Sequence, residues 1–506
     1  MADSTSPVAA GDKPATPSEA DKKLRAAAEA LLARAPAVSS GSVRLAGGGE
    51  PMPYEARVEF IPVMAQGFDG VLAEPQAAVM ATSYRLPGAA AGARPVCFAF
   101  NGGPGSASLW LHLGALGPQR VVVPDDSSAA RAPYTVADNP LSWYEHFDLV
   151  FIDPPHTGWS VAASEAARKR MLGVDGDVEA LTEVVRVWLT RHQRWGSPVY
   201  LAGESYGTTR GAALADTLQS AGVALRGLVL ISCAMDLQTL DFLPANELPY
   251  ALFLPAFANV SQYHGLLKGP LAASSQAARE AAEAFVVDDY LAALHAGHRL
   301  DARRRTRIAR RVAELTGLAP ELVEQQNLRI GDQTYFNEAM RAQGRVVGRL
   351  DARATAPMAA MHGHAMEFDP GIEAIAPAYT VAAMQHFGQV LGLSLEQRYE
   401  TLSHATHKAW NWNRGDANGG AFASTTPDLA RALRRNPHLR VLVASGRYDL
   451  GTPYSASDWS LAHLDVPAEV AARIEHRYYD AGHMMYTRSQ DLAQLKSDLA
   501  AWLSNA

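Results

Sequence analysis

Short apolar runs alternate with amphipathic helical segments through the first half of the chain. Period-two alternation and continuous apolar runs indicate strands; these lie at residues 56–63, 78–86, 95–100, 147–153, 199–202 and 225–232. A long amphipathic helix is predicted over residues 174–193. Because two early strand pairs precede alternating strands and helices, the pattern predicts an α/β sheet with an antiparallel entry.

The alternation stops after Asp236, and helical periodicity continues to about residue 395. Strand patterns return only at residues 439–445 and 474–479, before a C-terminal helix. We therefore expect one sheet interrupted by an inserted helical cap. The predicted division is a tail and helical arm over residues 1–40, a first core segment over 41–240, the cap over 241–395 and a second core segment over 396–506.

The N-terminal arm has its own signals. Residues 1–17 are rich in small residues and proline, which predicts a disordered tail. Ser18 and Asp21 resemble a capping box, and Pro36 follows, so a helix is predicted between them.

Composition narrows the possible functions. The chain has 506 residues, 48% of them hydrophobic and 19% charged, which is typical of a globular protein with one large domain and an insertion, or two to three domains. Its net charge of −7 argues against a nucleic-acid partner. We see no apolar run of about 20 residues, so no membrane span is predicted. The first 20 residues lack the apolar core of a secretory signal. We expect a cytoplasmic protein, or a periplasmic or secreted one if a signal was removed.

The first candidate for chemistry is the segment G-E-S-Y-G, residues 203–207. It joins a short apolar run to a helical pattern, so Ser205 sits at a strand-to-helix turn. The G-x-S-x-G elbow holds a serine hydroxyl clear of the backbone at the edge of a sheet. The pattern alone is weak, because an ordinary turn reads the same way.

A serine needs a base to take its proton, and the base needs an acidic partner. Asp449 follows the strand at residues 439–445, and His483 follows the strand ending at Tyr479. Nucleophile, acid and histidine in this order are typical of α/β-hydrolases. The sequence therefore predicts an α/β-hydrolase fold with a Ser205–Asp449–His483 triad.

An acyl-transfer site also needs backbone N–H donors for the oxyanion. The glycine-rich loop N-G-G-P-G, residues 101–105, directly follows the strand at residues 95–100. Glycines there allow the backbone to approach a ligand closely. It is not a phosphate loop, because no G-K-[ST] follows.

Several motifs together resemble the serine carboxypeptidase family. They are N-G-G-P-G-S-A-S, L-G-P, D-x-P-x-x-G-W-S, G-E-S-Y-G, S-G-R-Y-D and G-H-M, at residues 101–108, 116–118, 153–160, 203–207, 445–449 and 482–484. The resemblance implies that Ser205 is the nucleophile, His483 the general base and Asp449 its orienting acid.

The same resemblance assigns the remaining site residues. It implies an oxyanion hole from the backbone amides of Gly103 and Tyr206. It also implies that Asn101 and Glu204 bind the free carboxylate of a peptide C-terminus. A carboxyl group can accept a carboxylate partner only when it is protonated, which is why the family tends to favour acid pH.

This chain departs from the family pattern at four places. Ala99 stands where the family has tryptophan, and Ala115 where it has the glutamate that pairs with Glu204. His156 replaces a glycine, and Ser106 replaces a cysteine. The only two cysteines, Cys97 and Cys233, lie in apolar runs and are expected to be free buried thiols, which resembles a bacterial, disulfide-free branch.

The remaining arginine, histidine and tryptophan clusters do not indicate a further site. The arginines between residues 303 and 311 are expected on a solvated helix face. The pairs His362/His364 and His404/His407 lack acidic or cysteine residues at ligand spacing, so no metal and no cofactor are predicted. Trp410 and Trp412 are expected either beside the cleft or in the core.

The favoured function is a serine-type carboxypeptidase acting on peptides through an acyl-enzyme. An esterase or acyltransferase using the same triad is the first alternative, and the departures at Ala99 and Ala115 favour it. A catalytically idle binding protein is the second. The sequence leaves the oligomeric state, the preferred residue and the pH optimum open.

Overall fold

The computed structural model describes residues 18–64, 74–90, 92–360, 366–415 and 422–504. The predicted disordered tail and the pair His362/His364 lie outside the described residues. Within the described residues, no helix is both long and apolar enough to cross a bilayer.

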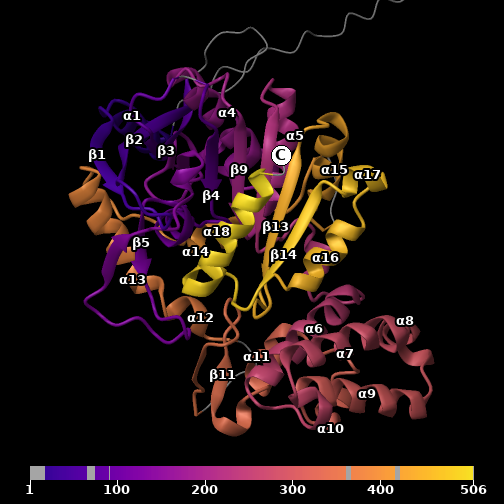
Figure 1. Cartoon of the computed structure of the whole chain (residues 1–506). Helices are drawn as coiled ribbons and strands as arrows, with labels where there is room; N and C mark the ends of the chain where they lie inside the picture. The colour runs from indigo at the N-terminus through magenta and orange to yellow at the C-terminus, as the bar shows by residue number, and fades with distance from the viewer. Residues whose placement is uncertain (1–17, 65–73, 91, 361–365, 416–421, 505–506) are drawn as a thin grey trace, which may run out of the picture.

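A ten-stranded mixed sheet forms the centre of the molecule (Figure 1). Its strand order is β1-β2-β3-β7-β4-β9-β10-β13-β14, with β8 paired to β3. The bounds are β1 Ala37–Val43, β2 Met52–Met64, β3 Pro75–Arg85, β4 Val96–Phe100, β7 Asp148–Ile152, β8 Val161–Ala162, β9 Val199–Glu204, β10 Leu225–Ile231, β13 Arg440–Gly446 and β14 Ile474–Tyr479. In the order β7-β4-β9-β10-β13-β14, neighbouring strands pair in parallel. Strand β1 pairs antiparallel with β2, β2 with β3, and β3 with β7. The predicted α/β-hydrolase fold is confirmed.

Side chains from the two faces of the sheet enter separate hydrophobic cores. On β4, Cys97 and Ala99 belong to one core, and Val96, Phe98 and Phe100 belong to the other. This alternation follows from the period of two along a strand. The first core is covered by α13 and α18, and α18 crosses in front of the sheet in Figure 1. The second is covered by α4, α5 and α15. The bounds are α4 Val174–Arg191, α5 Tyr206–Ser220, α13 Ala376–Gln385, α15 Thr426–Arg435 and α18 Ser489–Ser504.

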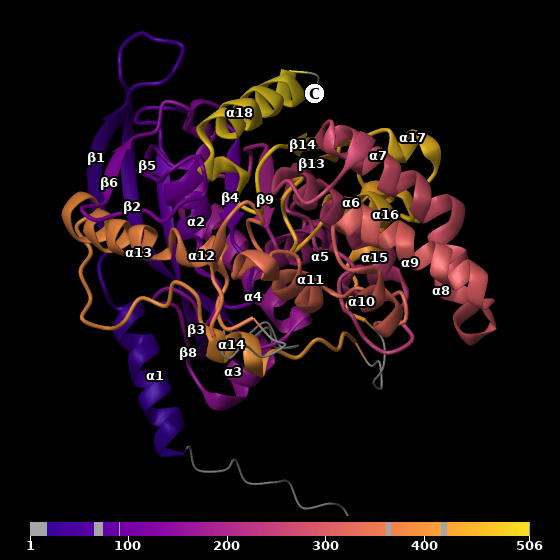
Figure 2. The same ribbon diagram turned by 90° about the horizontal axis from the view of Figure 1, so that it is seen from below.

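The segment between β10 and β13 contains a helical group with its own hydrophobic core. These helices are α6 Leu248–Tyr263, α7 Ser275–Phe285, α8 Leu291–Ala296, α9 Ala302–Thr316, α10 Pro320–Gln325 and α11 Asp332–Glu338. Both views show α6 to α10 gathered on one side of the molecule, beside α16 Tyr454–Ala462 (Figures 1 and 2). Tyr448 and Leu450, which flank Asp449, pack into this helical core. The group therefore supports the loop that carries one of the predicted site residues.

Other parts of the segment between β10 and β13 lie outside this helical group. A two-stranded hairpin, β11 Arg345–Val347 and β12 Thr355–Pro357, follows α11. The short helices α12 Pro370–Glu373 and α14 His404–Ala409 lie farther along. Helix α13 packs Ala378, Tyr379 and Ala382 into the main core instead of the helical group. The exact limits of the predicted cap stay a prediction.

The arm forms as its local signals predict. Helix α1 spans Glu19–Leu32, and Ser18 and Asp21 form both hydrogen bonds of a capping box. Leu31 is buried in the main core, so the helix docks against the sheet domain. Cys97 and Cys233 are both buried and free, as predicted.

Candidate active site

The strand-to-helix turn at Ser205 is strained and tightly packed. Ser205 has φ of 61° and ψ of −130° between β9 and α5. A positive φ at a non-glycine residue costs on the order of 1–3 kcal/mol and is tolerated where surrounding structure enforces it. A Cβ on Gly203 would overlap the carbonyl oxygen of Gly207, and one on Gly207 would lie 2.8 Å from the carbonyl oxygen of Phe100. Both glycines of the motif are therefore required by close backbone approach.

Asp449 lies in the loop after β13 and is fully buried. Its Oδ1 accepts hydrogen bonds from the backbone N–H groups of Gly451, at 2.7 Å, and Thr452, at 3.0 Å. Its Oδ2 accepts from the hydroxyl of Thr452 and from Nδ1 of His483, each at 2.7 Å. Four donors therefore fix one orientation of the carboxylate, with one oxygen facing the histidine.

His483 lies in the loop after β14 and is held at both ends. Its backbone N–H donates to the carbonyl of Leu350 at 2.6 Å, and its carbonyl accepts from the hydroxyl of Ser232 at 2.6 Å. Burial lowers the pKa of His483, but the charge and hydrogen bond of Asp449 outweigh burial, and Glu204 adds to them, so that pKa is raised above 6.5. Ser205 and His483 line one cavity of about 270 Å³.

The glycine-rich loop after β4 packs directly against the start of α5. A Cβ on Gly102 would overlap the backbone nitrogens of Tyr206 and Gly207. Gly103 has φ of +102°, which favours glycine. This packing places the loop against the first residues of α5; the oxyanion hole from Gly103 and Tyr206 stays a prediction.

Tyr206 is held from outside by aromatic packing. Trp410 and Trp412 meet its ring edge to face, with centroids 5.2 and 5.7 Å away. Together with Val174 they form a small hydrophobic cluster. The two tryptophans are thus packing partners of a predicted oxyanion-hole residue; neither lines the 270 Å³ cavity.

Asn101 and Glu204 lie side by side in the cavity. Asn101 Oδ1 accepts from the backbone N–H of Leu111 at 3.0 Å, so its Nδ2 is directed at Glu204 Oε1, 2.9 Å away. Burial raises the pKa of Glu204 from 4.5 to about 7, although His483, Tyr486 and Asn101 act to lower it. Glu204 Oε2 is buried with no hydrogen-bond partner in the described part of the chain. This carboxyl group is therefore half protonated near neutral pH, and its Oε2 makes no well-formed hydrogen bond within the described residues, although the Tyr486 hydroxyl is near enough to act on it.

Tyrosines surround Glu204 where the family resemblance implies a second carboxyl group. Ala115 is completely buried and offers no side-chain partner. The hydroxyl of Tyr486 acts to lower the pKa of Glu204. Burial raises the pKa of Tyr379, and the charge of Glu204 adds to that effect. The sequence reasoning did not find either tyrosine, because no motif marks them.

A buried ion pair connects the elements behind the site. Arg210 on α5 donates to Asp177 on α4 at 2.7 Å and to the carbonyl of Asn101 at 2.6 Å. Both side chains of the pair are 1% exposed. The guanidinium also lies over the Tyr206 ring, 5.1 Å from its centroid. This pair positions Asn101 and Tyr206 together, and it was missed because nothing in the sequence links residues 177 and 210.

The cavity wall also contains residues that the motifs did not indicate. Arg349 and Leu350 come from the segment between β11 and β12, and His404 and His407 come from α14. Apolar contacts are supplied by Trp110, Ile372, Leu402 and Met484. His156, which stands where the family has a glycine, is half-buried and does not line this cavity; its partial burial lowers its pKa to about 4. Among the described residues, no group of three or more His, Cys, Asp or Glu side chains is placed to hold a metal ion.

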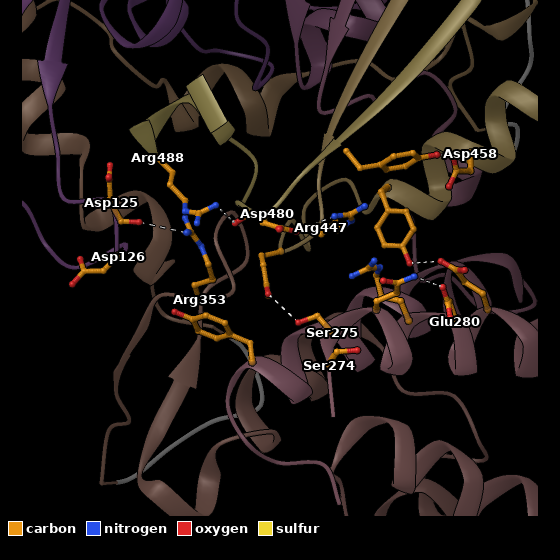
Figure 3. Close-up of a pocket in the computed structure, with 17 residues that line it drawn as sticks. Asp125, Asp126, Ser274, Ser275, Glu280, Arg353, Arg447, Asp458, Asp480 and Arg488 are labelled. Carbon is orange, nitrogen blue, oxygen red and sulfur yellow. Dashed lines mark hydrogen bonds and ion pairs between the residues drawn. The ribbon is translucent and has the colours of Figure 1, made fainter. Parts of the chain in front are cut away.

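A second cavity, of about 1080 Å³, lies between α7 and the ends of β13 and β14 (Figure 3). Its wall is strongly charged, and several of the charges are paired. Arg447 contacts Asp480 at 3.0 Å, and Arg488 contacts Asp491 at 2.8 Å. The hydroxyl of Tyr454 donates to Glu283 at 2.7 Å. None of the three predicted triad residues lines it.

Comparison with known proteins agrees with this geometry. Residues 88–238 match the family model described as serine carboxypeptidase. The pheromone-processing carboxypeptidase KEX1 of Yarrowia lipolytica is 31% identical over 160 residues, 30% of this chain and 23% of that protein. The serine carboxypeptidase-like 13 protein of Arabidopsis thaliana is 30% identical over 114 residues, 22% of this chain and 25% of that protein. The chain thus spans about a quarter of the length of the curated relatives it matches.

A solved structure extends the similarity in fold over most of the chain. The prohormone-processing carboxypeptidase KEX1ΔP of Saccharomyces cerevisiae matches with a TM-score of 0.55 and 13% identity, covering 89% of this chain and 92% of that one. At this identity the match concerns the fold. The resemblance to the serine carboxypeptidase family is confirmed, and the roles of individual site residues stay predictions.

Proposed function

We propose that this chain, whose residues 88–238 match the serine carboxypeptidase family model, removes C-terminal residues from peptides. Ser205 is the nucleophile in this proposal, His483 the general base and Asp449 the group that orients it. The 2.7 Å hydrogen bond from His483 Nδ1 to Asp449 leaves Nε2 as the nitrogen available to serine.

The reaction proceeds through an acyl-enzyme. The Ser205 hydroxyl attacks the carbonyl carbon of the last peptide bond while His483 accepts its proton. The backbone N–H groups of Gly103 and Tyr206 stabilise the oxyanion of the tetrahedral intermediate. As the C–N bond breaks, His483 gives the proton to the leaving amine. Water then attacks the ester with His483 again as base, which releases the shortened peptide and regenerates the serine.

The observation that carries the exopeptidase assignment is the state of Glu204. Its pKa of about 7 and its unpartnered Oε2 provide a protonated carboxyl group beside Ser205. Such a group donates a hydrogen bond to a carboxylate, as the substrate's C-terminus requires. The cavity of about 270 Å³ is below the usual size of drug-binding pockets, which suits one terminal residue better than a long chain.

An esterase or acyltransferase is a second candidate. The observation that favours it is the absence, among the described residues, of a second carboxyl group beside Glu204, since Ala115 and the two tyrosines occupy its surroundings. A substrate without a free carboxylate would still use the proposed triad and oxyanion hole.

One experiment separates these candidates. An N-blocked dipeptide with a free C-terminal carboxylate is compared with its amide and its ester across acid to neutral pH, with Ser205→Ala as the control. We expect the free acid to be hydrolysed by the wild type and not by the variant. Turnover of the ester with an inert free acid would refute the carboxypeptidase assignment. Failure of a fluorophosphonate to label Ser205 in folded protein would refute both enzymes and leave a binding protein.

A further inference from the structure

Arg349 is a cation in the wall of the active-site cavity, and its side chain is exposed. Within the described residues, its guanidinium has neither an ion pair nor a hydrogen bond. Two arginines around the neighbouring cavity differ in this respect: Arg447 contacts Asp480 (Figure 3), and Arg488 contacts Asp491. An arginine that faces a substrate cavity without a protein partner is available to the ligand.

The backbone around Arg349 is fixed, so its position is defined. The backbone N–H groups of Arg349 and Leu350 both donate to the carboxylate of Asp369, each at 2.9 Å. The carbonyl of Arg349 accepts from the backbone N–H of Leu450 at 2.9 Å. The carbonyl of Leu350 accepts from His483. The segment is therefore bound to both loops that carry predicted catalytic residues.

The guanidinium lies close to the reacting groups. A Cβ built on Gly451 would be 3.6 Å from the Arg349 Cζ, which places the guanidinium beside the loop that holds Asp449. Partial burial lowers the pKa of His407, and the charge of Arg349 lowers it further. The same charge acts to lower the pKa of His483.

The charges of the cavity favour an anionic ligand. Asp449 is already satisfied by His483, Thr452 and two backbone donors. Glu204 is largely uncharged below about pH 7. This leaves Arg349 as the unpaired full charge among the described residues lining the cavity, and its planar fork matches a carboxylate with two parallel hydrogen bonds.

We propose that Arg349 binds a carboxylate of the peptide substrate and is a specificity-determining residue. The carboxylate is either the terminal α-carboxylate or the side-chain carboxylate of an acidic C-terminal residue. This inference rests on the proposed function only in taking a peptide as the ligand. Arg349 thereby supplies, from the inserted segment, a positive charge for the carboxylate of the substrate.

The test measures binding without turnover, in a Ser205→Ala background. Calorimetry compares N-blocked dipeptides ending in glutamate, in glutamine and in glutamine amide, with and without Arg349→Gln. Arg303→Gln, on an exposed position of α9, removes the same charge from the same inserted segment and serves as the control. Because hydrogen bonds to charged groups are strong, Arg349→Gln is expected to weaken binding of the relevant carboxylate about 10- to 100-fold.

The peptides identify the source of the carboxylate. If only the glutamate peptide loses affinity, Arg349 binds the side chain. If the glutamate and glutamine peptides lose affinity equally and the amide does not, Arg349 binds the α-carboxylate. Equal losses for all three ligands, or no loss for any, would overturn the proposal. Raised salt should weaken the same interaction in the Ser205→Ala protein.

The failure of this inference is distinct from the failure of the proposed function. If wild-type protein does not hydrolyse the peptides but the Ser205→Ala protein binds them through Arg349, the carboxypeptidase assignment fails and the carboxylate site stands. If hydrolysis occurs and Arg349→Gln leaves every affinity unchanged, the function stands and the role of Arg349 is wrong.

Discussion

Replacing Glu204 with glutamine tests the protonation of the site most directly. Burial raises the pKa of Glu204 from 4.5 to about 7, a difference of 2.5 (7 − 4.5). Its protonated fraction is therefore about one half at pH 7 and about one tenth at pH 8. If the protonated form binds the terminal carboxylate, kcat/KM for a free-acid peptide should fall about fivefold between these pH values, beyond any change seen for the ester.

Glutamine donates a hydrogen bond at every pH, so Glu204→Gln should abolish this alkaline decline. The acid limb should also move to lower pH, because Glu204 raises the pKa of His483 and glutamine does not. The assay is kcat/KM from about pH 5 to pH 9 for one peptide as free acid and as ester. An alkaline limb that persists in the variant, or that the ester shares, would refute the reasoning.

The same substitution has a thermodynamic signature. A carboxyl group whose pKa is raised on folding binds more protons in the folded state, so the free energy of unfolding falls as pH rises from about 4.5 to 7. With these two pKa values, wild type should lose roughly 2.5 kcal/mol between pH 5 and pH 8 through Glu204 alone. Glu204→Gln should lack this loss in urea unfolding at the two pH values. Parallel pH dependence in both proteins would mean that Glu204 is ionised in the folded state.

Two further predictions concern the groups behind the reacting atoms. Gly102→Ala should lower kcat about 100- to 1,000-fold, which is the loss typical of one oxyanion donor. The reason is that a Cβ on residue 102 would overlap the backbone nitrogens of Tyr206 and Gly207. An unchanged kcat for the ester in folded protein would contradict this prediction. Arg210→Met should reduce the free energy of unfolding by about 3–5 kcal/mol because it leaves Asp177 buried and unpaired. Adding Asp177→Asn should recover part of that loss in urea unfolding; a single variant as stable as wild type would show that the pair is not buried in solution.

The central strands were predictable because their own residues carry the pattern. Strand β14 spans the predicted residues; β4, β9 and β10 differ from the predictions by one or two residues at one end, and β13 by one residue at each end. Strand β1 was missed, since Ala37–Val43 is mostly small and polar and alternates between partly buried and exposed positions. Its structure comes from antiparallel pairing with β2, which a local pattern does not record.

In the candidate site, too, some residues were predictable from the sequence and others were not. Ser205, Asp449 and His483 follow the carboxyl ends of β9, β13 and β14, and such residues in parallel strands meet at one edge of a sheet. Turn chemistry and chain order were enough to select them. The partners of these residues were not predictable, because Thr452, Tyr486 and Arg210 act through contacts that only the folded chain brings together.

The inserted segment shows why the site cannot be understood from its motifs alone. A cap is usually regarded as a cover that limits access, yet here the carbonyls of Arg349 and Leu350 accept backbone hydrogen bonds from Leu450 and His483. Asp369 anchors the same two residues from the other side. The position of His483, the proposed general base, therefore depends on direct hydrogen bonds to a segment about 130 residues before it in the chain. Changes in that segment should alter kcat as well as substrate preference, because Arg349, which we propose to contact the substrate, and Leu350, which holds His483, are adjacent in the chain.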